Sequence, residues 1–312
     1  MKKMFRPVFL GVIFSGVTVY AQTGWNGSTT NCEILPASSP YGEARAIRNI
    51  AYAEPSTARQ NFDLYLPMGK DGQKFPVVVW IHGGAWMMGS KEWDNVKYLV
   101  RHGYAIASVD YRVSTETNFP AQIQDCNAAL NFILSHAADY NLDTNKLVIG
   151  GASAGGHLAL LLGMARQEKQ FGANPAVKPL CILDFFGPTG LDQQLEDMQS
   201  ICSQKGMETI RDAGSKLLGG PLENEVAKAR WASPITYAST ANPPVLILQG
   251  GKDDLVPVAQ SQRLHAALDH EGIKNQLIVL PDVGHDGPLF SIPEVETKVL
   301  GFLNGLAKEG GK

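Results

Sequence analysis

Short apolar segments that alternate with longer amphipathic ones constrain the fold of this chain more than any other feature. Each apolar segment has four to six residues, which is typical of a strand buried on both faces of a parallel sheet. These segments lie at residues 77–81, 104–109, 146–149, 180–185, 245–248 and 276–280. The clearest helical spacing lies at residues 121–137, 155–166, 259–268 and 294–306. Strands and helices in alternation predict an α/β fold with a mostly parallel, doubly wound sheet.

Two departures from this alternation define the rest of the organisation. Residues 46–53 and 61–66 alternate between apolar and polar side chains, so we expect two edge strands joined by a turn, after a polar lead at residues 22–43. Residues 188–233 carry no buried-strand pattern and have helical character, which predicts a helical cap inserted after a central strand. Residues 22–312 have a size that suits one α/β domain, and we expect no second domain.

The first 21 residues have the parts of a secretory signal peptide. Three basic residues precede an apolar run at residues 8–19, and the small residue Ala21 marks the expected cleavage site. The run is too short to favour a permanent membrane span, so we expect a periplasmic or secreted protein. Removing residues 1–21 leaves 24 of the 27 basic residues and all 30 acidic ones, a net charge of −6. This acidic balance argues against nucleic acid or an anionic membrane as a partner.

The four cysteines do not define a metal site or a fixed disulfide pattern. Cys32, Cys126, Cys181 and Cys202 are an even set in a chain expected to be exported, but their spacing does not match a zinc site. Cys126 falls in a helical pattern and Cys181 in an apolar strand, where buried free thiols are common. A disulfide that involves Cys181 and Cys202 is the alternative.

The motif GASAG at residues 151–155 lies between a predicted strand and a predicted helix. Ligands of doubly wound sheets bind outside the carboxyl ends of the strands, so this position favours a functional role. The pattern G-x-S-x-G alone is weak, because glycine and serine are common in this chain. Its position and its small neighbours predict a nucleophile elbow, in which Ser153 sits on a strained turn. A tight glycine turn with an incidental serine is the alternative.

A second motif, HGGAW at residues 82–86, directly follows the strand predicted at residues 77–81. An acyl-transfer site needs backbone N–H groups that face the developing oxyanion, and this place in the sheet can supply them. Gly83 and Gly84 allow the backbone to turn its donors inward, and the N–H group of Ala154 would add another. We expect His82 to form hydrogen bonds within its loop and to have a structural role.

A serine hydroxyl is a poor nucleophile without a base, so the elbow predicts a histidine late in the chain and a carboxylate before it. Asp253 and His285 meet this requirement, because each lies in a loop that directly follows a predicted strand. Asp254 is the rival carboxylate. Asp286 directly follows His285 in the sequence, so its side chain cannot easily reach round to orient the His285 imidazole. The other histidines besides His82 fall in or beside predicted helices: His102, His136, His157, His265 and His270. The motifs therefore predict a triad of Ser153, His285 and Asp253.

Taken together, the motifs resemble those of bacterial α/β-hydrolase esterases, a group that includes acetyl xylan and feruloyl esterases of the Bacteroidetes type. The hormone-sensitive lipase group is a more distant likeness. The resemblance runs from about residue 46 to residue 306. The resemblance rests on the motifs WIHGGAW at 80–86, VDYR at 109–112, FPAQ at 119–122, GASAGGH at 151–157, DDLVP at 253–257 and GH at 284–285.

This resemblance implies an α/β-hydrolase fold, the same triad, and Gly83, Gly84 and Ala154 as oxyanion donors. It also implies that Asp110 and Arg112 form a structural pair that supports the oxyanion loop. The hormone-sensitive lipase group usually has Gly-Asp-Ser at the elbow and a helical cap before the first strand. The present chain has alanine at position 152 and a short lead, which favours the carbohydrate-esterase branch and a more open site.

The predicted reaction is hydrolysis of a carboxylic ester through an acyl-enzyme, without a metal or an organic cofactor. Export and the branch resemblance favour the removal of acetyl or feruloyl groups from plant polysaccharide fragments, so the expected ligand is an acylated oligosaccharide. A general short-chain carboxylesterase or lipase is the first alternative. An arylformamidase is less compatible with a signal peptide, and a non-catalytic binding module is less compatible with an intact triad.

Several large side chains near the predicted strand ends are candidates for the substrate pocket. They are Trp86, Met87, Met88, Phe185 and Phe186, of which we assign Trp86, Phe185 and Phe186 to substrate binding. Ordinary core packing is the alternative for each of them.

Overall fold

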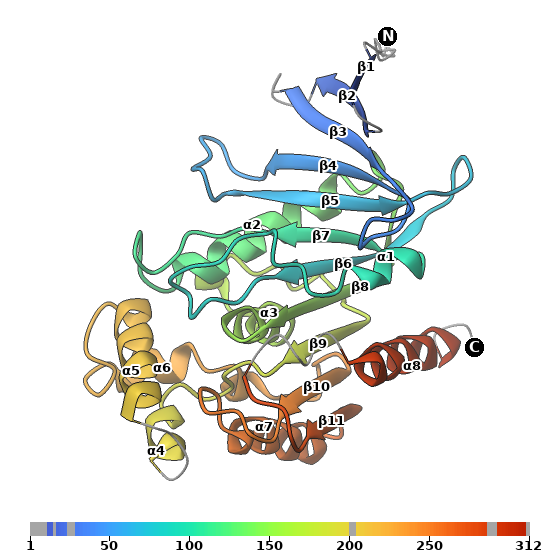
Figure 1. Ribbon diagram of the computed structural model, residues 1–312. Coiled ribbons are helices and arrows are strands. Elements are labelled where there is room, and N and C mark those ends of the chain that lie inside the picture. Colours follow the sequence, from blue (N-terminus) through green and yellow to red (C-terminus); the bar gives the residue numbers. More distant parts are fainter. Residues whose placement is uncertain (1–10, 15–16, 24–28, 200–203, 286–291, 310–312) are drawn as a thin grey trace.

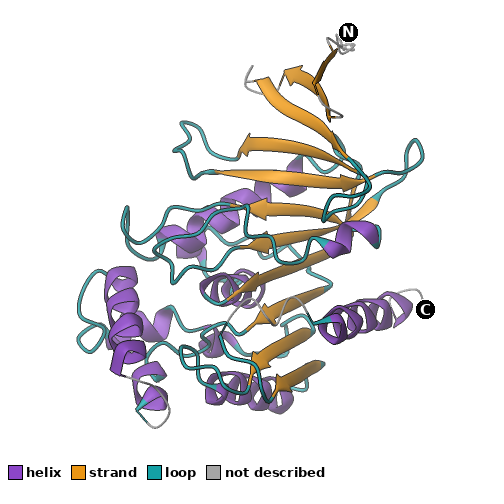
Figure 2. Ribbon diagram, viewed as in Figure 1, coloured by secondary structure: helices purple, strands orange, loops and turns teal. Residues whose placement is uncertain are grey.

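The computed structural model describes residues 11–14, 17–23, 29–199, 204–285 and 292–309 of the chain. A single mixed sheet runs through the protein (Figures 1 and 2). Its strands are β1 (Gly11–Phe14), β2 (Val17–Thr23), β3 (Thr29–Leu35), β4 (Ala44–Ala51), β5 (Asn61–Pro67), β6 (Phe75–Ile81), β7 (Ala105–Val109), β8 (Leu142–Ala152), β9 (Cys181–Phe185), β10 (Val245–Gly250) and β11 (Asn275–Leu280). Among the described residues, their order is β1-β2-β3-β4-β5-β7-β6-β8-β9-β10-β11.

The six apolar segments of the sequence form the parallel part of this sheet. Strands β7, β6, β8, β9, β10 and β11 pair in parallel, whereas β1 to β5 and the β5–β7 pair are antiparallel. The predicted α/β fold is therefore confirmed. The two strands expected at residues 46–53 and 61–66 are β4 and β5, but β4 is not an edge strand, because residues of the polar lead form β3 beside it.

Helices cover both faces of the sheet. They are α1 (Tyr98–Arg101), α2 (Ala121–Ser135), α3 (Ala154–Met164), α4 (Gln194–Met198), α5 (Gln204–Leu218), α6 (Val226–Trp231), α7 (Val258–His270) and α8 (Pro293–Glu309), with short 3₁₀ helices at Lys169–Phe171 and Pro234–Tyr237. Leu99 of α1 and Val299 of α8 belong to the apolar cluster on one face. Leu130 of α2, Leu158 of α3 and Leu264 of α7 belong to the cluster on the other.

Strand β6 shows how one sequence segment serves both clusters. Successive side chains of a strand point to opposite faces. Val77, Val79 and Ile81 pack in the cluster with α2 and α3, whereas Val78 and Trp80 pack in the cluster with α1 and α8. Burial on both faces explains why this segment is continuously apolar.

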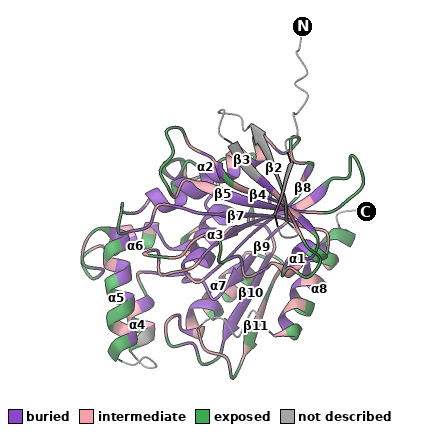
Figure 3. Ribbon diagram, turned by 45° about the horizontal axis from the view of Figure 1, so that its top comes forward, coloured by how far each residue is buried: buried purple, intermediate pink, exposed green. Residues whose placement is uncertain are grey.

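The predicted cap region at residues 188–233 contains α4, α5 and α6, between β9 and β10. These helices lie beyond the arrowheads of the parallel strands, at the carboxyl edge of the sheet (Figure 1). Helix α5 buries Ile210, Ala213 and Leu217 and exposes its opposite side (Figure 3). The insertion is therefore placed where it can form one wall of a site at the strand ends.

The predicted signal segment is only partly described. Residues 1–10 and 15–16 lie outside the described residues, and β1 with most of β2 falls within residues 1–21. The expected cleavage after Ala21 falls inside β2, so export and cleavage stay predictions. Within the described ranges, no helix is both long enough and apolar enough to cross a bilayer.

The described cysteines are buried free thiols. They are Cys32, Cys126 and Cys181. Cys202 lies outside the described residues, and Cys181 in β9 takes part in no disulfide. Burial raises the pKa of the Cys126 and Cys181 thiols, which keeps both in the unreactive protonated form.

Close packing of α3 on the end of β6 gives a test of the fold. A Cβ atom at Gly155 would lie 2.1 Å from the Ile81 carbonyl oxygen and 2.5 Å from that of His82. We expect Gly155→Ala to lower the free energy of unfolding by about 1–3 kcal/mol, although alanine is the better helix former. The measurement is urea unfolding of both proteins.

Gly301→Ala is the matched control, because Gly301 also lies in a helix but a Cβ atom there would meet nothing within 4 Å. We expect this variant to gain about 0.5–1 kcal/mol. Equal unfolding free energies for the two variants would contradict the packing account.

Candidate active site

Three loops at the carboxyl ends of parallel strands bring Ser153, Asp253 and His285 together. Ser153 lies between β8 and α3, Asp253 follows β10, and His285 follows β11. The His285 Nε2 atom is 2.9 Å from the Ser153 Oγ atom, and its Nδ1 atom is 2.8 Å from the Asp253 Oδ2 atom. The three residues singled out in the sequence therefore form one continuous chain of hydrogen bonds.

The turn that carries Ser153 is strained and tightly packed. Ser153 has φ of 54° and ψ of −122°, a conformation that few side-chain-bearing residues adopt. Its N–H group donates to the Phe185 carbonyl oxygen at 2.8 Å. A Cβ atom at Gly151 would lie 2.3 Å from the Gly155 carbonyl oxygen, so the turn requires glycine there. This geometry holds the serine at the end of the sheet, as expected of a nucleophile elbow.

The Asp253 carboxylate is held by four donors. Its Oδ1 atom accepts from the N–H groups of Leu255 and Val256 at 2.9 and 2.8 Å, and its Oδ2 atom accepts from Gln249 Nε2 at 2.9 Å as well as from His285. The Gln249 side chain is fixed in turn by Ser261, whose hydroxyl donates to it at 2.8 Å. Sequence reasoning missed Gln249, although a polar residue at the end of a buried strand was the available signal.

The two carboxylates of the DDLVP segment differ in environment. Asp253 is buried and binds His285, whereas Asp254 is exposed to solvent. The structure therefore favours Asp253 over its rival as the partner of the histidine. Asp286, the neighbour of His285 in the sequence, lies outside the described residues.

The HGGAW loop passes directly over the elbow. A Cβ atom at Gly83 would lie 2.8 Å from the Ala152 carbonyl oxygen, and one at Gly84 would lie 2.2 Å from the Met88 carbonyl oxygen. Gly84 also has φ of 112°, which favours glycine. Gly83, Gly84 and Ala154 line the same cavity as Ser153. The loop therefore has the position required of an oxyanion-binding segment.

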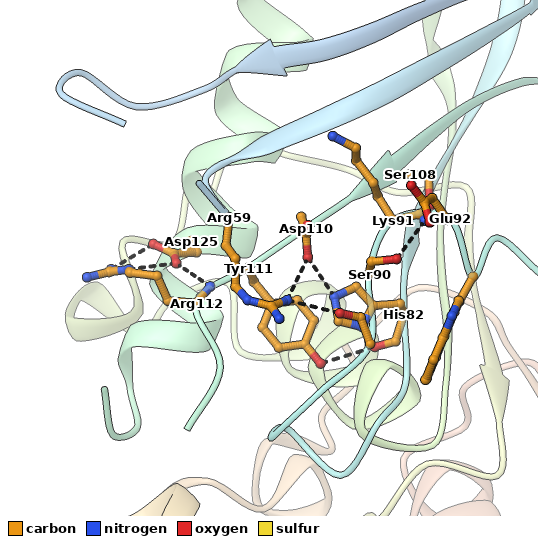
Figure 4. Close-up of polar contacts among 12 residues, drawn as sticks. Arg59, His82, Ser90, Lys91, Glu92, Ser108, Asp110, Tyr111, Arg112 and Asp125 are labelled. Carbon is orange, nitrogen blue, oxygen red and sulfur yellow. Dashed lines mark hydrogen bonds and ion pairs between the residues drawn. The ribbon is translucent and has the colours of Figure 1, made fainter. Parts of the chain in front are cut away.

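The prediction that Asp110 pairs with Arg112 is wrong. Arg112 binds Asp125 of α2 through two nitrogen atoms at 2.8 and 2.7 Å, and Asp110 instead contacts His82 at 3.0 Å and Arg59 at 3.3 Å (Figure 4). The sequence could not show that α2 brings a second carboxylate against Arg112. Asp110 still supports the oxyanion loop, through His82, which is buried as expected of a structural histidine.

A cavity of about 510 Å³ contains Ser153 and His285. Apart from the oxyanion loop and the elbow, its wall is mostly apolar and includes Trp86, Met87, Met88, Trp93, Phe186, Ile210 and Leu255. Ile210 comes from α5, so the inserted helices do complete the wall.

Two of the three proposed substrate-binding residues, Trp86 and Phe186, line this cavity, and Phe185 does not. Phe185 is fully buried, with its ring edge-to-face with Trp80 at 5.6 Å. Phe185 is the last residue of β9 and faces the cluster with α1 and α8. Phe186 has a positive φ, and the centroid of its ring lies 4.8 Å from that of the His285 ring. Assigning Phe185 to the pocket was wrong because Phe185 still follows the alternation of β9 and faces the same cluster as Cys181 and Leu183.

His157 connects the oxyanion loop to the inserted helices, a role that sequence reasoning missed. Its Nδ1 atom accepts a hydrogen bond from Trp86 Nε1 at 3.2 Å, and its Nε2 atom donates to the Ala232 carbonyl oxygen at 2.6 Å. One accepted and one donated hydrogen bond define a neutral imidazole. Complete burial lowers the pKa of His157 to about 4, which favours the same neutral form.

The described residues include no cluster of three or more His, Cys, Asp or Glu side chains suited to a metal ion. The absence of a cofactor is therefore still a prediction from the sequence.

The fold and the hydrogen-bonded Ser153, His285 and Asp253 define an α/β-hydrolase with a serine-hydrolase arrangement of side chains. The family model described as BD-FAE matches residues 62–268, which are 207 of the 312 residues. The chain belongs to the BD-FAE family.

Two of the curated relatives that the chain matches are esterases of greater length. Esterase LipQ of Mycobacterium tuberculosis is 29% identical over 215 residues, which are 64% of this chain and 47% of LipQ. Isoprenylcysteine alpha-carbonyl methylesterase ICME of Arabidopsis thaliana is 27% identical over 245 residues, which are 76% of this chain and 56% of ICME. This chain spans about half the length of these relatives.

Solved structures show the same fold. A bifunctional GH43-CE protein of Bacteroides eggerthii has a TM-score of 0.74 and 29% identity, covering 84% of this chain and 35% of that protein. A truncated carbohydrate esterase from gut microbiota has a TM-score of 0.74 and 25% identity, covering 88% of this chain and 99% of that one. The resemblance to bacterial α/β-hydrolase esterases is therefore confirmed.

Burial of His157 makes stability depend on pH. The pKa of His157 is about 4 in the folded chain against 6.5 ordinarily, so below about pH 6.5 the unfolded chain binds a proton that the folded chain does not. Stability falls as pH falls through this window, by up to about 1.4 kcal/mol per pH unit.

The measurement is urea unfolding of wild type and His157→Gln across this pH range. We expect the stability advantage of the wild type to shrink by about 2 kcal/mol between about pH 6.5 and about pH 4.5. A difference that does not change with pH would show that His157 is not buried as a neutral group.

Proposed function

We propose that this protein is a serine hydrolase that cleaves carboxylic esters through an acyl-enzyme. The continuous hydrogen-bond chain from Asp253 through His285 to Ser153 is the observation that carries the proposal. The site residues come from three separate loops, which makes a chance arrangement of this kind improbable. The esterase names of the curated relatives support the same reaction class.

In the first step, His285 Nε2 takes the hydroxyl proton of Ser153 while the Oγ atom attacks the ester carbonyl carbon. The tetrahedral oxyanion receives hydrogen bonds from the backbone N–H groups of Gly83, Gly84 and Ala154. The C–O bond to the alcohol then breaks, and the alcohol leaves with the proton from His285. The products of this step are the free alcohol and an ester of Ser153.

In the second step, water attacks the acyl-enzyme as His285 takes one of its protons. Collapse of the tetrahedral intermediate releases the carboxylic acid and returns the proton to Ser153 Oγ. Asp253 keeps the Nδ1–H group of His285 in place throughout and stabilises the transient imidazolium. Gln249 and the N–H groups of Leu255 and Val256 keep the carboxylate aimed at the ring.

We propose acylated oligosaccharides, with acetyl or feruloyl groups on plant polysaccharide fragments, as the substrates. Export, which the leader pattern predicts, would give the enzyme access to such fragments. The wall of the cavity supports the choice, because Trp93 and Met88 are 48% and 55% exposed beside it. An exposed aromatic face can pack against the C–H face of a sugar ring. Asn95 and Thr209 add polar groups to the wall.

A general short-chain carboxylesterase is the second candidate. The mostly apolar wall formed by residues such as Met87, Phe186 and Ile210 suits an alkyl acyl chain without any sugar. The two candidates share the triad and differ in the alcohol that they release.

The first test compares ester substrates for wild type and Ser153→Ala. We expect wild type to release acetate or ferulate from acylated xylan fragments at rates that rival p-nitrophenyl acetate and butyrate. Ser153→Ala should lose at least about 10⁴-fold in kcat and should resist labelling by an organophosphonate. Turnover of the p-nitrophenyl esters alone would favour the general carboxylesterase. An active Ser153→Ala variant would contradict the assignment of Ser153 as the nucleophile of the triad.

A second test addresses the sugar. We expect Trp93→Ala to lose about tenfold in kcat/KM on acetylated xylo-oligosaccharides, the equivalent of about 1.4 kcal/mol, and to change less than about twofold on ethyl acetate. Ethyl acetate is used because its alcohol is too small to stack on the indole ring. Met68→Ala is the control, since Met68 is 51% exposed but lies between β5 and β6, near the opposite edge of the sheet. An equal loss on both substrates would contradict a sugar contact at Trp93.

A further inference from the structure

His82 is fully buried, and both of its ring nitrogens face oxygen acceptors. Figure 4 shows the contact with Asp110. The Nδ1 atom is 2.7 Å from the Gly83 carbonyl oxygen, and the Nε2 atom is 3.0 Å from the Asp110 Oδ1 atom. A carbonyl oxygen and an ionised carboxylate can accept hydrogen bonds but cannot donate them. Each contact therefore needs a proton on the ring nitrogen, and a neutral imidazole has only one such proton.

The other two histidines at the site have different partners. His285 donates to the Asp253 carboxylate and accepts from the Ser153 hydroxyl. His157 accepts from Trp86 Nε1 and donates to a carbonyl oxygen. Each of these two rings is satisfied by one proton. His82 differs from them in needing two.

We propose that His82 is an imidazolium cation which, together with Asp110 and Arg59, fixes the Gly83–Gly84 peptide of the oxyanion loop. The positioning effect rests on the ester hydrolysis proposed above, but the protonation state does not. His82 acts through the loop and touches no reacting atom, so it is a positioning residue.

The charges around the ring favour this form. Arg59 Nη1 also donates to the Asp110 Oδ1 atom, at 3.3 Å, so the oxygen that faces His82 already accepts from another donor. Arg59 in turn binds Glu116 at 3.1 Å, so two carboxylates, Asp110 and Glu116, lie in the cluster beside the one guanidinium. The Tyr111 ring stacks on the imidazole with centroids 4.4 Å apart and planes within 12°, an arrangement that stabilises a cation.

The cluster acts on both ends of the loop. A planar trans peptide directs its N–H group away from its carbonyl group. Because His82 holds the Gly83 carbonyl oxygen, the N–H group of Gly84 is directed away from the imidazole. Arg59 Nη1 also donates to the Gly89 carbonyl oxygen at 2.9 Å. The same cluster therefore also fixes the loop at Gly89, where the chain passes back beside His82. A neutral His82 would leave one of its two oxygen partners facing a lone pair.

The direct test is nuclear magnetic resonance of the full chain labelled with ¹⁵N-histidine at neutral pH. We expect both ring nitrogens of His82 to carry protons that exchange slowly, whereas His157 should carry one. The signals are assigned by their loss in His82→Gln and, if that variant does not fold, by their shift in Tyr111→Phe. A single protonated nitrogen at His82 would overturn the proposal.

Kinetics test the positioning effect. Oxyanion donors act mainly in the transition state, so Asp110→Asn should lower kcat by about tenfold or more and leave KM within about twofold. Asp125→Asn is the matched control, because Asp125 is also a buried carboxylate that binds an arginine. Among the described residues, its hydrogen-bond partners are Gln60 and Arg112, which lie outside the loop. We expect this control to keep the wild-type kcat.

The outcomes separate the two proposals. Wild-type kcat in Asp110→Asn, or an equal loss in both variants, would overturn the positioning effect. A wild type that hydrolyses no ester would contradict the proposed function, while the two-proton signature of His82 would still be measurable.

Discussion

The close approach of α3 to the end of β6 is the contact on which the site depends. Gly155 lies so near the carbonyl oxygens of Ile81 and His82 that a methyl group would clash with both. This approach lets the turn at Ser153 meet the backbone of Gly83, where a Cβ atom would touch Ser153 at 3.4 Å. Ser153 and the oxyanion loop can therefore approach each other because Gly83 and Gly155 have no side chains.

One loop after β6 lies beside Ser153 and also forms part of the cavity wall. It begins with the glycines beside Ser153 and continues to Met88 and Trp93 on the cavity wall. The sheet fixes its far part, because Trp80 Nε1 donates to the Trp93 carbonyl oxygen at 3.1 Å and the Ser108 hydroxyl donates to the Lys91 carbonyl oxygen at 2.6 Å. A substrate bound by this loop would therefore be placed at a fixed position relative to the proposed oxyanion donors, which belong to the same loop.

Motif order was enough to single out the three residues that form the hydrogen-bond chain, because parallel strands bring their carboxyl ends to one edge of a sheet. The errors have a common origin. Pairing Asp110 with Arg112 failed because α2 supplies Asp125. Assigning Phe185 to the cavity failed because its side chain follows the alternation of β9 into the core. Each outcome depends on a neighbour that is distant in the sequence or on the direction of one side chain.

The sequence by itself determined the α/β fold and the place of Ser153, since both follow from local periodicity and from small residues at fixed positions. Only the tertiary structure decided that Gln249 and two backbone N–H groups hold Asp253, and that His82 faces two acceptors while His157 faces one. The reason is that a hydrogen bond depends on which groups meet in space. Residue types in a sequence state what can donate or accept, and the fold alone selects the partners.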